Sequence, residues 1–133
     1  MAHAISTGPS REQYWSITRP GFVFLQDYVR ERFPDEKDVH YAMWTALCVN
    51  GISLDREYSI DPKLVIKMRD ILLTCAKEIA RGDAGIIEDY VDERGGWSPE
   101  VVAQVWEMQR EIFNELVEIL SRWRPEADCP QEA

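Results

Sequence analysis

Carboxylates are the side chains of this sequence that come closest to a chemical motif. Residues 88–100 hold five of them, at positions 88, 89, 92, 93 and 100, around two adjacent glycines and a tryptophan. Hard cations such as Mg²⁺ take oxygen ligands and are commonly held by a few carboxylates together with substrate phosphates. The stretch is therefore either part of a magnesium-dependent active site or only the corner between two helices.

Two pairs of carboxylates are loosely similar to the magnesium site of all-α nucleotide pyrophosphohydrolases. Those enzymes use an ExxE pair followed by an ExxD pair, and this chain offers Asp89 with Asp92, then Glu115 with Glu118. The order of residue types is reversed, and Glu118 projects away from the apolar face of its helix, so convergence is not expected. A magnesium-dependent enzyme of this kind stays an alternative, and we predict no catalytic residue, no metal ligand and no cofactor.

Nucleophilic and zinc chemistry are also not predicted. On one helix, Cys48 follows His40 by eight residues, or roughly 12 Å, which is too far for proton transfer. The chain has three cysteines without metal-type spacing and only two histidines, which argues against a zinc site. Cys48 and Cys75 lie in apolar helical patterns and are expected to be buried, whereas Cys129 is expected to be an exposed thiol.

Helix signals punctuate the whole chain and predict the elements that would position these residues. Capping residues precede a first-turn proline at three helix starts. A capping box at Ser10 predicts a short helix that continues through YWSI, whereas residues 51–60 show no helical period. The other predicted helices cover residues 19–33, 36–49, 62–81 and 99–123, with a short one over 84–94. We expect a compact all-α bundle of about five helices with one long C-terminal helix.

The predicted domain organisation is simple. Residues 10–124 form a single α-helical domain, and residues 1–9 and 125–133 are expected to be flexible tails. The helix over 62–81 carries a second apolar stripe, which includes Ile66 and Leu73 with Ala76 and Ala80. A helix that is apolar around most of its circumference is either central in its domain or shared with a second chain. We expect a homodimer; the alternative is a monomer that buries both faces.

The charge of the chain restricts its partners. The net charge is −9, and many of the carboxylates follow residue 82. Such a surface repels nucleic-acid backbones and anionic membranes, so we expect neither as a partner. The predicted acidic surface consists of Glu88, Asp89, Asp92 and Glu93, and it meets either water or a basic protein. Because the N-terminus lacks signal-peptide features and no apolar run approaches ~20 residues, we expect a cytoplasmic protein.

Aromatic residues supply the predicted binding site. The chain has five tryptophans and five tyrosines, and several are hard to place in a helical core. Because exposed Trp and Tyr anchor many protein interfaces, the predicted partner-binding residues include Tyr41, Trp44 and Trp15. Ile66 and Leu73, from the second apolar stripe of the helix over 62–81, complete the predicted set. The sequence favours a small acidic regulator that binds and modulates or inhibits another protein without catalysis. A bundle that binds a small ligand in an aromatic pocket is a further alternative.

Overall fold

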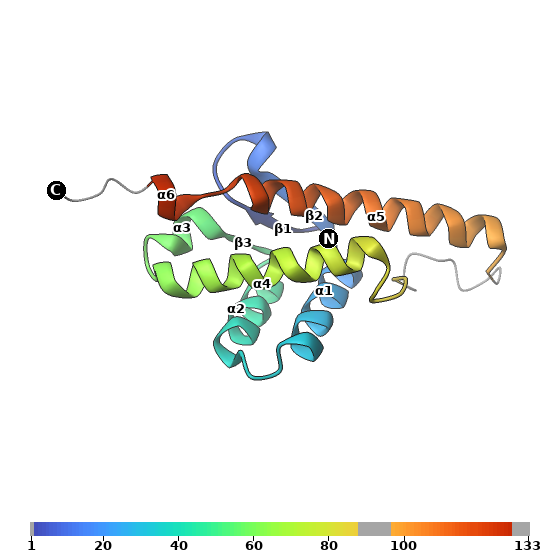
Figure 1. The fold of residues 1–133 in the computed structure, drawn as a ribbon, viewed down its shortest axis with the longest axis horizontal. Coiled ribbons are helices and arrows are strands. Elements are labelled where there is room, and N and C mark those ends of the chain that lie inside the picture. The colour runs from blue at the N-terminus through green and yellow to red at the C-terminus, as the bar shows by residue number, and fades with distance from the viewer. Residues whose placement is uncertain (1, 88–96, 129–133) are drawn as a thin grey trace.

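The computed structural model describes residues 2–87 and 97–128, which form a mostly helical fold with a small sheet (Figure 1). Figure 1 shows α4 and α5 running side by side, with the α1–α2 hairpin projecting from α4 and the strands behind the two long helices. The elements are β1 (Ala2–Ser6), a 3₁₀ turn η1 (Arg11–Gln13), β2 (Tyr14–Thr18), α1 (Arg19–Arg32), α2 (Lys37–Cys48), β3 (Gly51–Ser53), α3 (Leu54–Tyr58), α4 (Pro62–Arg81), α5 (Pro99–Arg122) and α6 (Pro125–Asp128).

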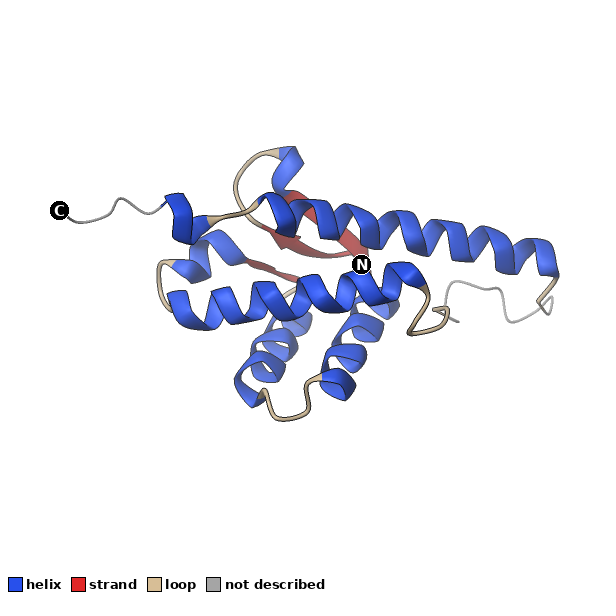
Figure 2. Cartoon of the chain, viewed as in Figure 1, coloured by secondary structure: helices blue, strands red, loops and turns tan. Residues whose placement is uncertain are grey.

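The sheet shows that the predicted all-α class is wrong (Figure 2). Its strand order is β2-β1-β3, with β1 antiparallel to β2 and parallel to β3. Ile5 lies opposite Trp15 on one side and Ile52 on the other. Residues 2–6, predicted to belong to a flexible tail, are therefore the central strand. At the other end of the chain, part of the predicted tail forms α6.

The β2 segment was predicted to be helical, and its burial pattern explains the difference. Trp15 and Ile17 are buried, while the residues between and beside them are exposed, which is the period of two that a half-buried strand requires. The predicted capping interaction is present, since the Gln13 side chain accepts from the Ser10 amide at 3.3 Å. The turn that it closes nevertheless ends at Gln13.

The predicted caps of the three longest helices are confirmed. In each case a side-chain oxygen accepts from the amide three residues later, and a proline follows in the first turn. The pairs are Thr18 with Gly21 at 3.4 Å, Asp61 with Leu64 at 3.2 Å, and Ser98 with Val101 at 3.2 Å. These local signals fix the starts of α1, α4 and α5.

Between α4 and α5 the chain departs from the predicted helix over 84–94. Residues 84–87 are not helical, and residues 88–94 lie outside the described part of the chain. Gln109 interrupts the apolar stripe of α5 and is nevertheless fully buried. Its Oε1 accepts from the Ile87 amide and its Nε2 donates to the Gly85 carbonyl, both at 2.8 Å. A single glutamine thus holds residues 85–87 against α5.

The core joins the sheet to the long helices. Trp15 is only 1% exposed, packs its ring 5.6 Å from that of Phe113, and donates its Nε1–H to the Ile112 carbonyl at 2.7 Å. On the opposite side of the core, Leu72 and Cys75 of α4 are completely buried. Within the described residues, no helix has the length and apolar character needed to span a membrane.

Candidate protein-binding site

The outer face of α2 carries two neighbouring exposed aromatic side chains. Tyr41 is 70% exposed and Trp44 is 53% exposed, and their ring centroids lie 6.3 Å apart. Val49, just beyond the end of the helix, is exposed as well. Large apolar side chains that gather on a surface indicate an interaction site more strongly than scattered ones do. We call Tyr41, Trp44 and Val49 the aromatic face.

The opposite side of α2 fixes the direction in which this face points. Val39, Met43 and Ala46 are buried in the core at helical spacing. Tyr41 and Trp44 lie roughly half a turn around the helix from these positions, so they fall on its outward side. Burial of the inner stripe therefore holds the aromatic residues in water.

Charged contacts fasten the N-terminus of α2 to α4. The Lys67 ammonium group donates to Asp38 at 2.6 Å and lies 2.8 Å from a Glu36 carboxylate oxygen. These hydrogen bonds raise the pKa of Lys67, and the bond from Lys67 lowers the pKa of Asp38. Lys67 therefore stays protonated and Asp38 stays ionised near neutral pH. Because these side chains are exposed, the contact orients α2 more than it stabilises the fold.

A groove of about 360 Å³ adjoins the aromatic face. Its walls come from α2, β3, α3 and the start of α4, and they combine apolar side chains with one cation and one carboxylate. The lining residues are Tyr41, Ala42, Thr45, Ala46, Val49, Gly51, Ile52, Ser53, Arg56, Glu57 and Leu64. A concave surface with apolar walls and a few polar groups is the usual form of a binding site.

The structure separates the predicted partner-binding residues. Tyr41 and Trp44 are exposed side by side, but Trp15 is a core residue, so its assignment to the surface is wrong. Ile66 and Leu73 are half-buried on α4. Ile66 lines another cavity, of about 430 Å³, beside Phe33. The predicted acidic surface at positions 88, 89, 92 and 93 lies outside the described residues.

The predicted thiols have different surroundings. Cys75 is buried, as predicted, and desolvation raises the pKa of its thiol to about 12, which keeps it protonated. Cys48 was also predicted to be buried but is exposed. His40, two turns earlier on α2, contacts the Phe33 carbonyl through Nε2 at 2.7 Å. That contact leaves the imidazole with a structural partner at the end of α1.

Metal ligation finds no geometric basis in the described part of the chain. Over residues 2–87 and 97–128, no three His, Cys, Asp or Glu side chains come together in a way that could hold a metal ion. Glu115 and Glu118 are both exposed on α5, and the aspartates predicted to face them lie outside the described ranges.

Sequence reasoning missed the residues that complete the groove. Asn50 and Gly51 both have positive φ angles, of 67° and 153°, and they turn the chain from α2 into β3. A side chain at Gly51 would lie 2.6 Å from the Ala4 carbonyl oxygen, so only glycine fits beside β1. The NG pair therefore follows the end of α2 and begins β3, where Ile52 lines the groove.

Comparison of the chain with protein-family models, with curated proteins and with solved structures finds no match.

Proposed function

We propose that this chain is a small acidic regulator that binds another protein and modulates or inhibits it, without catalysis of its own. The observation that carries the proposal is the exposed Tyr41–Trp44 pair on α2. Tyr and Trp dominate the energetics of protein interfaces because each buries a large, rigid surface at a low cost in side-chain entropy.

The groove beside the aromatic face suggests what the partner presents. Its walls include Val49, Ile52 and Leu64, so it suits a bulky apolar side chain. Arg56 and Glu57 line the same groove and can hydrogen-bond the backbone or polar groups next to that side chain. We therefore propose that the partner contributes a short segment with an apolar anchor, which the aromatic face covers.

Charge supports a basic partner. The chain has a net charge of −9, and long-range attraction of this kind raises the association rate with a positively charged surface. Charged residues at the rim of an interface mainly affect the rate of association, whereas buried aromatic anchors determine the rate of dissociation. The two contributions can therefore be measured separately.

We propose that the protein works in the cytoplasm. The cysteines within the described residues, Cys48 and Cys75, are both free. Free thiols suit a reducing compartment, where disulfides are rare. Fusion of the chain to a redox-sensitive or fluorescent reporter in its native cell tests this, and a periplasmic or extracellular signal would contradict it.

Truncation of the aromatic face tests the binding proposal. After a partner has been captured from the native cell, we expect the purified pair to associate with a fixed stoichiometry in calorimetry. Trp44→Ala and Tyr41→Ala should each weaken that association by at least about tenfold, while the midpoint of thermal unfolding stays near the wild-type value, because both rings are exposed. Trp97→Ala is the matched control, since Trp97 is also exposed but precedes α5.

Two results would contradict the proposal. Equal loss of affinity in the Trp44 and Trp97 variants would show that the aromatic face has no special role. Unfolding of the Trp44→Ala variant would show that the ring supports the fold rather than an interface.

We also propose a homodimer, which Ile66 and Leu73 on α4 support because both stay partly exposed. Ala76 and Ala80, the other members of that stripe, are buried within the chain and add little to a dimer interface. Light scattering tests the proposal, and a mass near 15.5 kDa would reject it.

A further inference from the structure

A second groove, of about 640 Å³, lies between α4 and α5. It shares no residue with the groove beside α2. Its lining residues are Lys77, Ala80, Arg81, Trp106, Arg110 and Asn114. Lys77 and Arg81 are one turn apart on α4, and Trp106, Arg110 and Asn114 follow one another at successive turns of α5. This spacing therefore places both rows of side chains along the same groove.

The charge of this groove is opposite to that of the whole chain. Its lining includes three cations and no carboxylate, in a protein with a net charge of −9. Among the residues that the structure describes, Lys77 makes no ion pair. Lys77 is therefore free to contact an anionic ligand.

The two arginines have carboxylate partners that a ligand could replace. Arg81 contacts Asp83 at 3.0 Å, and Arg110 contacts Glu107 one turn earlier on α5. All four side chains are about half exposed, and ion pairs of this kind contribute little. A ligand with several negative charges can therefore draw both guanidinium groups into the groove at a small energetic cost.

Trp106 gives the groove a fixed flat wall. Gly82 ends α4 with a φ of 99°, and a side chain there would lie 2.5 Å from the indole Cη2. The ring therefore rests directly on the backbone at the end of α4, where glycine allows it. Trp106 is only half-buried, so part of its indole remains available for contact with a ligand.

We propose that the α4–α5 groove binds a small polyanion that carries a flat ring, of the nucleoside diphosphate class. The ring packs on Trp106, and Lys77, Arg81 and Arg110 bind the phosphates. Three positive charges match a diphosphate better than a single carboxylate, and guanidinium groups bind phosphate oxygens in a bidentate manner. The Asn114 amide can both donate to and accept from the polar edge of the ring.

Calorimetric titration of the full chain with ADP, pyrophosphate and adenosine tests this proposal. ADP should bind more tightly than either of the other two compounds, because only ADP provides both the ring and the phosphates. Its affinity should fall as salt is added, as expected for contacts between phosphates and cations.

Variants locate the binding. Lys77→Gln and Arg110→Gln should each weaken ADP binding about tenfold, the effect of losing one charge-assisted hydrogen bond. Lys63→Gln, which removes the same charge from the exposed first turn of α4, should leave the affinity unchanged. Circular dichroism verifies that each variant is folded.

Three outcomes would overturn the proposal. Absence of ADP binding would show that the groove is not a nucleotide site. Equal affinity for ADP and pyrophosphate would show that Trp106 contributes nothing. Equal weakening of ADP binding by Lys63→Gln and Lys77→Gln would show that the binding depends on net charge and not on this groove.

Discussion

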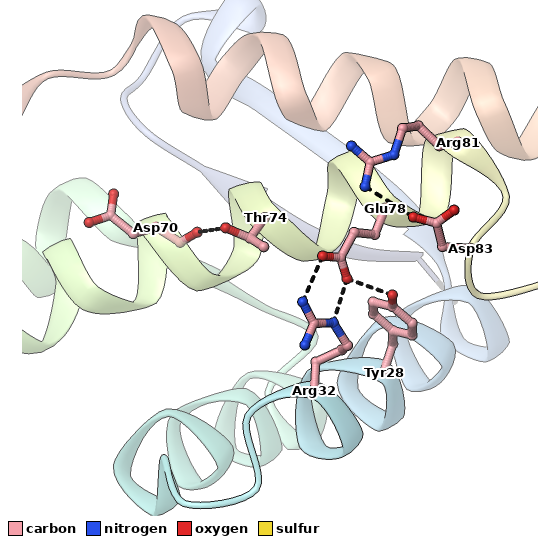
Figure 3. A network of polar contacts seen from close by, with 7 residues as sticks. All are labelled: Tyr28, Arg32, Asp70, Thr74, Glu78, Arg81 and Asp83. Carbon is pink, nitrogen blue, oxygen red and sulfur yellow. Dashed lines mark hydrogen bonds and ion pairs between the residues drawn. The ribbon is translucent and has the colours of Figure 1, made fainter.

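Glu78 provides the sharpest test of how the helices are held together (Figure 3). Its carboxylate accepts from Arg32 Nε at 2.6 Å, from Arg32 Nη2 at 2.8 Å, and from the Tyr28 hydroxyl at 2.6 Å. Both donors belong to α1 and the acceptor belongs to α4, so the cluster joins the two helices. Glu78→Gln keeps the size of the side chain but removes the charge on which the paired geometry depends.

The size of the effect follows from the ionisation of Glu78. The hydrogen bonds from Arg32 lower the pKa of the Glu78 carboxyl from 4.5 to about 2. At about 1.4 kcal/mol per pKa unit, this would correspond to roughly 3 kcal/mol of stability at neutral pH. The Arg32 side chain is 46% exposed, so solvent screens the pair. We therefore expect Glu78→Gln to lower the free energy of unfolding by about 2 kcal/mol.

The pH dependence has a definite sign. Because the pKa of Glu78 is lower in the folded chain than in the unfolded chain, its contribution is complete above about pH 4.5. As the pH falls from 4.5 towards 2, the unfolded state takes up the proton first and the contribution is lost. The stability difference between wild type and Glu78→Gln should therefore shrink to roughly half of its neutral value near pH 3.

Urea unfolding at pH 7 and pH 3, followed by circular dichroism, measures both quantities. Asp27→Asn is the control, because the Asp27–Arg30 pair is exposed, 3.9 Å apart and lies within α1 alone. That variant should change stability by less than about 0.5 kcal/mol. Glu78 has no such role if Glu78→Gln lowers the free energy of unfolding no more than the control does, or if it lowers it equally at both pH values.

Three further predictions concern particular positions. Gly82→Ala should lower the free energy of unfolding by about 2 kcal/mol, because the positive φ of Gly82 and the indole ring over it both oppose a side chain. Gly85→Ala should lower it by about half as much in the same urea experiment, because the space around Gly85 is open. Gln109→Leu should cost about 2 kcal/mol and speed amide exchange at residue 87, because it leaves two backbone groups without their partner; slow exchange at that amide would refute it. In a variant whose third cysteine is serine, a thiol reagent should label Cys48 in the native protein and Cys75 only after unfolding.

Helix boundaries could be predicted because their causes are local. Thr18, Asp61 and Ser98 cap their helices through amides only three residues away. The strands have no comparable local cause. β1 pairs with residues 14–18 on one side and with residues 51–53 on the other, so its structure depends on contacts that no short window of sequence contains. Strands of three and five residues are also too short for a clear alternating pattern.

The candidate site was predicted only in part, because some of its residues depend on local helix periodicity and others on contacts between distant parts of the chain. Residue type alone marked Trp15 and Trp44 as equal candidates for a surface. Trp44 lies on a helix whose buried residues, Val39, Met43 and Ala46, are spaced three and four apart, so periodicity within that helix indicates which side faces outward. The burial of Trp15 instead depends on Ile112 and Phe113, which are almost one hundred residues away in the chain. Gln109 is similar, since its role depends on a loop that approaches α5 only in the folded state.

The two charged clusters explain how a projecting hairpin can present a rigid aromatic face. The α1–α2 hairpin lies against α4 on the side away from α5 (Figure 1). Arg32 near its tip binds Glu78 of α4, and Glu36 and Asp38 just beyond the tip bind Lys67 of α4. Both contacts fasten the tip of the hairpin to α4, so they add to the buried stripe of α2 in holding that helix in place. An interface that depends on Tyr41 and Trp44 gains from this restriction, because a face ordered before binding loses less entropy when the partner arrives.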